Sequence, residues 1–193
     1  MKQEEKGITV YCASSTSIGE KYFTAARDLG CEIASRKITL ITGAGSMGLM
    51  GAVNDAAIAA GGHTIGVIPE FMVDRGWQHN GLDRLEVCDS MHSRKKRMAE
   101  LALGVIALPG GIGTFEELLE IITWRQLGLY NGNIVIYNVD GYYDNMLAML
   151  QTAIHERFMK PDHHLLWSVA TSAAAAVDIA LSPHINNSFS LKF

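Results

Sequence analysis

The sequence predicts an α/β protein, a three-layer sandwich in which helices cover both faces of a mostly parallel sheet. Short apolar runs rich in valine and isoleucine alternate with segments of helical periodicity along the 193 residues. These runs are nearly continuous in hydrophobicity, as expected for strands that are buried on both faces. Hydrophobic residues make up 48% of the chain and charged residues 19%, which fits a globular protein with a sizeable core.

The expected strands end in glycine, proline or small polar residues. They are residues 7–13, 37–42, 63–69, 84–88, 104–109 and 133–138, with a weaker last candidate at 165–170. The expected helices are residues 17–35, 47–61, 90–102, 114–129, 141–158 and 172–181. Because no linker or repeat interrupts this alternation, we expect one domain over residues 1–193, with a loose tail at 182–193 that has no clear period.

Composition excludes several classes of protein. The net charge of −4 and the pI of about 5.9 argue against nucleic acid as the partner. The three cysteines, Cys12, Cys31 and Cys88, are too far apart along the chain for a metal motif, and an odd number fits a reducing compartment. Residues 1–7 lack the apolar segment of a signal peptide, and no apolar run reaches membrane-spanning length. We therefore expect a cytoplasmic protein with no membrane partner and no metal.

Ligands of parallel α/β sheets bind beyond the carboxyl ends of the strands. In this chain that rule points to the loops at residues 12–18, 43–48, 69–80, 89–94 and 109–114. Two of these loops are rich in glycine, which lets backbone N–H groups approach an anion at a helix N-terminus.

The first glycine loop, residues 43–48, reads GAGSMG and matches the pattern GxGxxG between a strand and a helix. Glu70 follows 22 residues after Gly48, as in some dinucleotide-binding folds, but the loop follows the second strand rather than the first. Two interpretations stay open at this point. The loop either binds phosphate or makes a tight turn that packs a helix against the sheet.

The second glycine loop lies in residues 108–120, which read LPGGIGTFEELLE. Its three glycines precede a helix, and the Thr114 hydroxyl could either cap that helix or contact a phosphate. Thr114 and Glu117 also have the spacing of a capping box, in which Glu117 would bond back to the first backbone N–H. Helix physics alone favours that structural explanation for the carboxylates that follow the loop.

The segment at residues 89–101 carries the densest basic run, Arg94-Lys95-Lys96-Arg97. Ser90 is the expected N-cap. Met91, Met98, Leu101 and Ala102 are the residues expected to pack inward. By itself such a run indicates a solvated helix face. Its position at the carboxyl end of a strand also allows an arginine to bind an anionic ligand through two N–H groups.

Three stretches together resemble the LONELY GUY phosphoribohydrolases. They are GLMG (48–51), MHSRK (91–95) and PGGIGTFEE (109–117), and the family signature is PGGxGTxxE with an upstream MHxRK. The resemblance extends from about Ile8 to about Pro161. It implies a Rossmann-like fold, a homodimer, and cleavage of the N-glycosidic bond of a purine nucleoside 5′-monophosphate, AMP or a cytokinin nucleotide. The products would be the free base and ribose 5-phosphate, and no cofactor would be needed.

The resemblance also implies roles for individual residues. Arg94 and Glu117 match the catalytic pair of the family. The positions that match substrate-contacting residues are Lys95, Gly110, Gly111, Ile112, Gly113, Thr114, Phe115, Glu116 and Thr123, and we expect Ser14, Gly43, Gly45 and Met91 to line the same pocket. On this basis Glu117 would stabilise the positive charge of an oxocarbenium-like sugar and activate water. Arg94 would orient the nucleotide, and both glycine loops would hold the phosphate.

The chain departs from the family in three places. Ala13 and Ala44 replace glycines, and residues 73–82, VDRGWQHNGL, lack the glutamate that relatives often carry there. The identity of the base therefore stays open. Two rival functions also stay open: a molybdenum-cofactor carrier, which would bind a phosphate-bearing pterin without catalysis, and a dinucleotide-dependent oxidoreductase, which would rest on the GxGxxG match alone.

Overall fold

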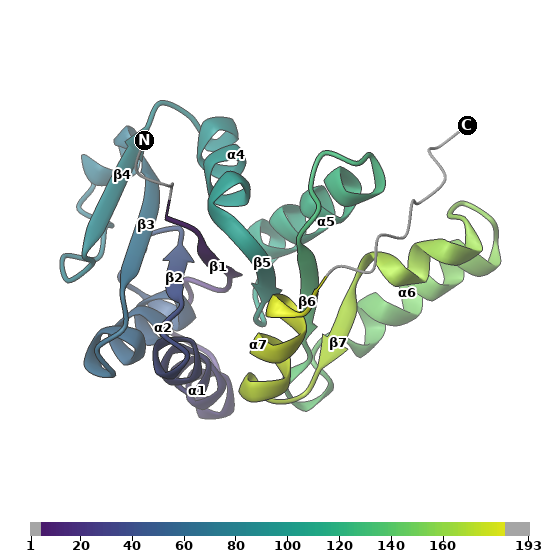
Figure 1. The fold of residues 1–193 in the computed structure, drawn as a ribbon, viewed down its shortest axis with the longest axis horizontal. Helices are drawn as coiled ribbons and strands as arrows, with labels where there is room; N and C mark the ends of the chain where they lie inside the picture. Colours follow the sequence, from purple (N-terminus) through teal and green to yellow (C-terminus); the bar gives the residue numbers. More distant parts are fainter. Residues whose placement is uncertain (1–4, 184–193) are drawn as a thin grey trace.

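The structure, a computed structural model, describes residues 5–183, and its centre is a parallel sheet (Figure 1). The sheet has seven strands in the order β4-β3-β2-β1-β5-β6-β7, and every neighbouring pair is parallel. The strands are β1 (Gly7–Tyr11), β2 (Thr39–Thr42), β3 (Thr64–Pro69), β4 (Arg84–Cys88), β5 (Ala102–Ala107), β6 (Asn133–Tyr137) and β7 (Ser168–Ala170). The predicted α/β class with a mostly parallel sheet is confirmed.

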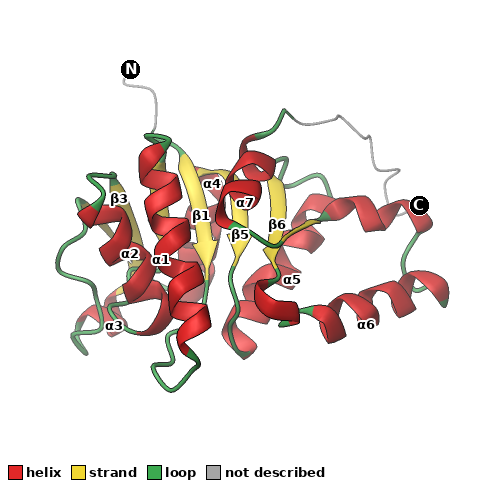
Figure 2. Cartoon of the chain, turned by 90° about the horizontal axis from the view of Figure 1, so that it is seen from below, coloured by secondary structure: helices red, strands yellow, loops and turns green. Residues whose placement is uncertain are grey.

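Helices cover both faces of the sheet, and in Figure 2 α1 lies in front of β1 while α4 lies behind it. The helices are α1 (Glu20–Ser35), α2 (Gly48–Ala59), α3 (Glu70–Val73), α4 (Met91–Leu101), α5 (Ile112–Gln126), α6 (Asp144–His155) and α7 (Ala173–Leu181). Two short 3-10 helices, η1 (Val139–Gly141) and η2 (Pro161–Leu166), complete the set. No helix among residues 5–183 is long and apolar enough to cross a membrane.

Two apolar clusters form the core, one on each side of the sheet. On one side α1, α2 and α7 bury residues such as Leu29, Val53 and Val177. On the other side α4 and α5 bury residues such as Met98 and Leu118. All five residues of β1 are buried, as their continuous hydrophobicity predicts. The sheet therefore forms the middle layer between two helical layers.

The boundaries of several elements differ from the predicted ones by two residues or more, and three of these differences have a structural reason. Helix α5 begins at Ile112 rather than Thr114, since Gly111 serves as its N-cap. Strand β5 occupies residues 102–107 rather than 104–109, because α4 passes directly into it without a loop. The weak last strand shortens to residues 168–170, since η2 takes up the residues before Trp167. Of the predicted tail at 182–193, residues 184–193 lie outside the described part of the chain.

The strand order reverses at β1, which lies between β2 and β5. In open parallel sheets this reversal leaves a crevice outside the carboxyl ends of the strands, where ligands bind. Ala13, just after β1, connects the loops at that crevice. Its N–H donates to the Pro109 carbonyl at 3.2 Å, and its carbonyl accepts from the N–H groups of Leu49 and Met50 at 2.9 and 3.2 Å. Both glycine loops are therefore fixed to the end of β1.

Candidate active site

Arg94 is buried between the carboxyl ends of β2 and β3, where hydrogen bonds to two backbone carbonyls hold its side chain. Its Nε donates to the Val67 carbonyl and its Nη2 to the Gly43 carbonyl, each at 3.0 Å. The arginine is only 6% exposed. Gly43 has to be glycine here, since a Cβ on it would overlap the Arg94 guanidinium. These contacts leave the remaining nitrogen, Nη1, to face Met91 at 3.8 Å and Glu117 at 4.0 Å.

Glu117 lies on the second turn of α5, opposite Arg94. The 4.0 Å between Arg94 Nη1 and Glu117 Oε1 is an ion-pair distance but too long for a hydrogen bond. The predicted capping box does not form. Because α5 begins at Ile112 with Gly111 as its N-cap, Thr114 lies inside the helix. No side chain forms a capping hydrogen bond at the helix start. The Glu117 carboxylate is thus not engaged with the helix terminus, and it faces the arginine.

Burial raises the pKa of Glu117 from its ordinary value of 4.5 to about 7. Arg94 and Lys95 oppose this increase, while the nearby carboxylates of Glu116 and Glu120 add to it. Burial and the charge of Glu117 also raise the pKa of the Cys12 thiol at the end of β1. A carboxyl that changes charge near neutral pH beside a fixed arginine is typical of a catalytic site.

Lys95, the neighbour of Arg94, joins α4 to α5 through two carboxylates. Its Nζ contacts Glu116 and lies 3.0 Å from Glu120 Oε2. The Lys95 side chain is 8% exposed, whereas that of Glu116 is 51% exposed. Burial lowers the pKa of Lys95, but the hydrogen bonds to both carboxylates outweigh it and raise that pKa above its ordinary value. Glu116, Glu117 and Glu120, the acidic residues that follow the second glycine loop, therefore each lie within ion-pair distance of Arg94 or Lys95 on α4.

The first glycine loop uses its N–H groups inside the protein. Those of Ala44, Gly45 and Ser46 donate to Thr42 Oγ1, Met50 Sδ and the Trp77 carbonyl. The Ala13 carbonyl occupies two further N–H groups at the start of α2. Of the two interpretations that the sequence left open, the structure favours the tight turn. The loop contributes the Gly43 carbonyl that fixes Arg94.

The second glycine loop, by contrast, leads into a helix whose first backbone N–H groups have no acceptor in the described chain. Among the hydrogen bonds of residues 5–183, none uses the backbone N–H of Ile112, Gly113 or Thr114 at the start of α5. A Cβ built on Gly111 or Gly113 would meet open space, and Ile112 is 84% exposed. Three N–H groups without an acceptor at a helix N-terminus form an arrangement suited to an anion, and two of them, those of Ile112 and Gly113, belong to exposed residues while Thr114 is buried.

The remaining predicted residues lie at different distances from the Arg94–Glu117 pair. Ser14 is exposed in the loop after β1, where its backbone contacts Gly48 of the first glycine loop. Phe115 points toward the core, edge-on to Tyr143 with ring centroids 6.2 Å apart. Thr123 is exposed and donates to the Leu119 carbonyl within α5. It continues the helix stripe of Glu116, and no contact in the described chain joins it to Arg94 or Glu117.

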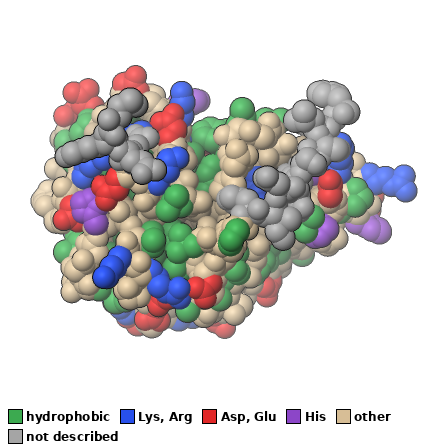
Figure 3. All heavy atoms as spheres, viewed as in Figure 1, with side chains coloured by type: hydrophobic (Ala, Val, Ile, Leu, Met, Phe, Trp, Pro, Cys, Tyr) green, Lys and Arg blue, Asp and Glu red, His purple; other side chains and the backbone are tan. Residues whose placement is uncertain are grey.

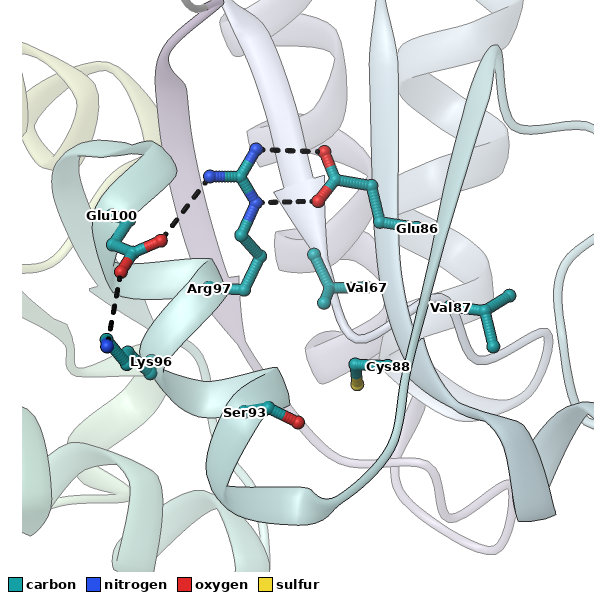
Figure 4. A pocket seen from close by; sticks show the side chains of 8 residues that line it. All are labelled: Val67, Glu86, Val87, Cys88, Ser93, Lys96, Arg97 and Glu100. Carbon is teal, nitrogen blue, oxygen red and sulfur yellow. Dashed lines mark hydrogen bonds and ion pairs between the residues drawn. The ribbon is translucent and has the colours of Figure 1, made fainter.

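The basic run on α4 divides into two pairs, so the prediction of a solvated face is wrong for half of it. Arg94 and Lys95 are buried toward the site. Arg97 instead forms a two-pronged ion pair with Glu86 of β4, at 2.6 and 3.2 Å, and Lys96 lies 3.9 Å from Glu100 (Figure 4). These residues line a cavity of about 330 Å³ together with Val67, Val87, Cys88 and Ser93.

The surface carries no continuous basic face on the side that Figure 3 shows, where Lys and Arg side chains alternate with Asp and Glu. Among residues 5–183 no group of three His, Cys, Asp or Glu side chains has the arrangement of a metal site. The charged residues that do cluster at the crevice are those of α4 and α5.

Sequence reasoning missed several residues at this site. Glu120 shares Lys95 with Glu116, and its i, i+4 spacing from Glu116 is a signal that could have revealed it. Tyr142 and Tyr143 hydrogen-bond the carbonyls of Gly110 and Leu108, at 2.6 and 2.8 Å. No local pattern marks these tyrosines, because their partners are more than thirty residues away.

Comparison with known proteins assigns the chain to a family. A family model described as "Possible lysine decarboxylase" matches residues 50–180. A cytokinin riboside 5′-monophosphate phosphoribohydrolase of Arabidopsis thaliana is 40% identical over 177 residues, which cover 92% of this chain and 78% of the relative. A second Arabidopsis thaliana protein of that name is 43% identical over 160 residues, 83% of this chain and 74% of the relative. The chain belongs to the LONELY GUY phosphoribohydrolase family.

Solved structures resemble this LONELY GUY family member in fold. The molybdenum cofactor carrier protein of Chlamydomonas reinhardtii superposes with a TM-score of 0.67 at 22% identity, covering 90% of this chain and 94% of that one. The molybdenum cofactor binding protein of Rippkaea orientalis gives a TM-score of 0.69 at 20% identity, covering 91% and 96%. At these identities the likeness concerns the fold alone, which is Rossmann-like as the family resemblance implied.

Proposed function

We propose that this protein is a phosphoribohydrolase that cleaves the N-glycosidic bond of a purine nucleoside 5′-monophosphate. The free base and ribose 5-phosphate are the products. The observation that carries the proposal is the pairing of a fixed Arg94 with a buried Glu117, 4.0 Å apart, beside a helix N-terminus whose N–H groups are unused. Names of relatives that are 40% and 43% identical support the same reaction class.

Glu117 supplies the carboxylate of the reaction. As the bond from the sugar to the base nitrogen breaks, positive charge develops on the ribose ring. The ionised carboxylate stabilises this charge and accepts a proton from the attacking water, whose oxygen bonds to the anomeric carbon. The electron pair of the broken bond goes to the base nitrogen, which takes up a proton from solvent, and Glu117 then returns the proton of the attacking water to solvent. The buried surroundings of Glu117 strengthen these interactions, since the local dielectric is low.

Arg94 and the start of α5 hold the rest of the nucleotide. With Nε and Nη2 bound to backbone carbonyls, Arg94 presents Nη1 to the substrate or the leaving base. The N–H groups of Ile112, Gly113 and Thr114 bind the 5′-phosphate. Glu117 lies about one helical turn further along α5, so its carboxylate reaches the sugar rather than the phosphate.

The substrate-contacting set is completed by residues around this pair. We place Lys95, Gly110, Gly111, Phe115, Glu116 and Thr123 on the α5 side, and Ser14, Gly43, Gly45 and Met91 on the side of β1 and β2. The reaction uses no cofactor or metal in this scheme. The protein works as an N-glycosidase in the cytoplasm, a reducing compartment that fits its three free cysteines.

We further propose that the protein is a homodimer. Exposed apolar side chains support this, among them Leu129, Met149 and Phe158, which are 72%, 68% and 86% exposed. A symmetric dimer would cover such residues with the same surface of a second copy. Light scattering coupled to size-exclusion chromatography measures the mass directly, and a mass of one chain of 21.0 kDa at micromolar concentration would contradict the dimer.

The experiment for the reaction uses purified protein with AMP and, separately, isopentenyl-AMP, followed by chromatography of the products. Release of adenine or isopentenyladenine with stoichiometric ribose 5-phosphate is expected. Glu117→Gln, which keeps the shape and removes the charge, should abolish release. If the wild-type protein liberates no base from any purine nucleoside monophosphate, the proposal is wrong. That result would favour the molybdenum-cofactor carrier function, because a carrier needs no Arg94–Glu117 pair.

A further inference from the structure

The hydroxyl groups of Tyr142 and Tyr143 hold the second glycine loop through its backbone carbonyls. Tyr143 Oη donates to the Leu108 carbonyl at 2.8 Å, and Tyr142 Oη donates to the Gly110 carbonyl at 2.6 Å. The Pro109 carbonyl between them accepts from the Ala13 N–H at 3.2 Å. Three successive carbonyls at the end of β5 are therefore each engaged by a donor of the protein.

These contacts bear on which atoms of the loop an anion would meet. A carbonyl oxygen carries partial negative charge and repels phosphate, whereas a backbone N–H attracts it. The residues that follow these carbonyls, Ile112 to Thr114, have N–H groups with no acceptor in the described chain, and Ile112 and Gly113 are exposed. The tyrosines fix the peptide planes on the carbonyl side, and so fix the direction of the chain as it enters α5.

Further hydrogen bonds and an ion pair hold the turn that carries the two tyrosines. Asn138 accepts a hydrogen bond from the Tyr143 N–H at 2.8 Å and donates to Asp144 Oδ1 at 2.7 Å. Asp140 adopts a left-handed backbone with φ of 50°, which residues other than glycine seldom do, and its side chain pairs with Lys21 of α1. Strain of this kind persists only where surrounding contacts determine the conformation.

Aromatic packing sets the orientation of the Tyr142 ring. It lies edge-on to Tyr143 with centroids 5.1 Å apart and edge-on to Tyr22 of α1 with centroids 5.6 Å apart. Tyr143 is fully buried, while Tyr142 is 37% exposed. The Tyr142 hydroxyl can therefore be removed with little cost to the core, whereas removal of the Tyr143 hydroxyl leaves the buried Leu108 carbonyl without its partner.

We propose that Tyr142 and Tyr143 are positioning residues for phosphate recognition. Through the carbonyls of Gly110 and Leu108 they aim the N–H groups at the start of α5 toward the 5′-phosphate of the substrate. The inference rests on the proposed function in one respect, since it takes the phosphate of the nucleotide as the anion. The same geometry also recognises ribose 5-phosphate and inorganic phosphate, which provide probes that need no turnover.

The test compares the full-length wild-type protein with Tyr142→Phe. We expect KM for AMP and the dissociation constant for ribose 5-phosphate to rise together, by roughly fivefold, as for one hydrogen bond of ordinary strength. We expect kcat to change less than twofold and inhibition by free adenine to be unchanged, since neither depends on the phosphate. A structural defect would instead change all four quantities.

Tyr130→Phe is the matched control, because the Tyr130 hydroxyl is buried and has no hydrogen-bond partner in the described chain. This variant should bind ribose 5-phosphate as the wild type does. Tyr143→Phe should give the same phosphate defect as Tyr142→Phe with a lower melting temperature. If Tyr143→Phe does not fold, the ribose 5-phosphate affinity of Tyr142→Phe alone tests the positioning role.

Direct calorimetric titration with ribose 5-phosphate and with inorganic phosphate separates this inference from the proposed reaction. A protein that releases no base but binds ribose 5-phosphate more weakly after Tyr142→Phe would disprove the reaction and support the positioning role. Unchanged ribose 5-phosphate affinity in Tyr142→Phe would overturn the positioning role, whether or not the protein cleaves AMP. Failure of the wild type to bind either anion would overturn it as well.

Discussion

Arg94 Nη1 and Glu117 Oε1 lie 4.0 Å apart, on helices that follow β4 at the sheet edge and β5 beyond the strand reversal. Both side chains are nearly buried, with 8% and 11% of their surface exposed. Arg94 is satisfied by backbone carbonyls, so it does not depend on Glu117 for its hydrogen bonds. The carboxylate can therefore change its charge while the arginine keeps its place.

The pH dependence of activity should report this carboxyl. Because the pKa of Glu117 is about 7 and the ionised form is the active one, kcat/KM for AMP should rise with pH to a plateau above pH 8, with its midpoint near 7. Initial rates between pH 5 and 9 measure it. A midpoint near 4.5, the ordinary value of a glutamate, would show that the burial of Glu117 does not persist in solution.

Stability should depend on pH in the opposite direction. The folded-state pKa of Glu117 is raised, so its contribution is fully present below about pH 4.5 and is lost as pH rises through about 7. Relative to Glu117→Gln, the wild type should lose on the order of 3 kcal/mol of unfolding free energy across that window. Urea denaturation at pH 4.5, 6 and 8 compares the two proteins. Parallel curves would contradict the prediction.

Neighbouring charges should move the activity midpoint in predictable directions. Lys95 lowers the pKa of Glu117 and Glu116 raises it. Lys95→Met should therefore shift the midpoint of the kcat/KM profile to higher pH, and Glu116→Gln should shift it to lower pH. The shape of the profile is the readout, so that changes in substrate affinity do not obscure the shift. Shifts of the same sign would refute the electrostatic explanation.

Arg94→Lys should impair catalysis although it keeps the positive charge. One ammonium group cannot bind the Val67 and Gly43 carbonyls and also present a donor toward Glu117, as the guanidinium does. We expect kcat/KM to fall about 100-fold, the range for removal of one fixed donor from an active site. Steady-state kinetics on AMP test this, with circular dichroism as the control for folding. Retention of wild-type kcat/KM would remove Arg94 from the mechanism.

Gly43→Ala should reduce activity by displacing the arginine, because the added Cβ would overlap the Arg94 guanidinium. A loss of about tenfold in kcat/KM is expected, as for a small misplacement of a catalytic group. Gly19→Ala is the matched control, since its Cβ would have no neighbour nearer than 3.9 Å. Equal activities of the two variants would show that the close approach at Gly43 has no catalytic meaning.

Periodicity predicted the sheet and the long helices well, because their burial follows from local patterns. The continuous apolar run of β1 and the inward-facing Met98 and Leu101 of α4 behave as expected. The Ser90 N-cap is also confirmed, by its hydrogen bond from the Ser93 N–H at 3.2 Å. The start of α5 was misplaced because its cap, Gly111, offers no side chain that could mark the helix boundary.

The environment of the site was harder to predict, since its contacts join distant segments. The local sequence around Arg94 and Lys95 predicts a solvated helix face. The fold instead brings the carbonyls of Gly43 and Val67 to Arg94, and the carboxylates of α5 to Lys95. The same limit applied to Glu117, where a local capping box was a sound explanation that the true helix start removes. Motif resemblance pointed to the pair, while only the structure supplies its geometry.

The two carbonyl contacts of Arg94 also determine when its loss of freedom occurs. An arginine side chain gives up roughly 2 kcal/mol of rotamer entropy when it is immobilised. Here immobilisation accompanies folding, because Val67 and Gly43 hold the guanidinium in the absence of any ligand. Binding of a nucleotide then meets a preorganised donor and incurs little further entropic cost at this residue. The cost falls on the thermodynamic stability of the empty protein.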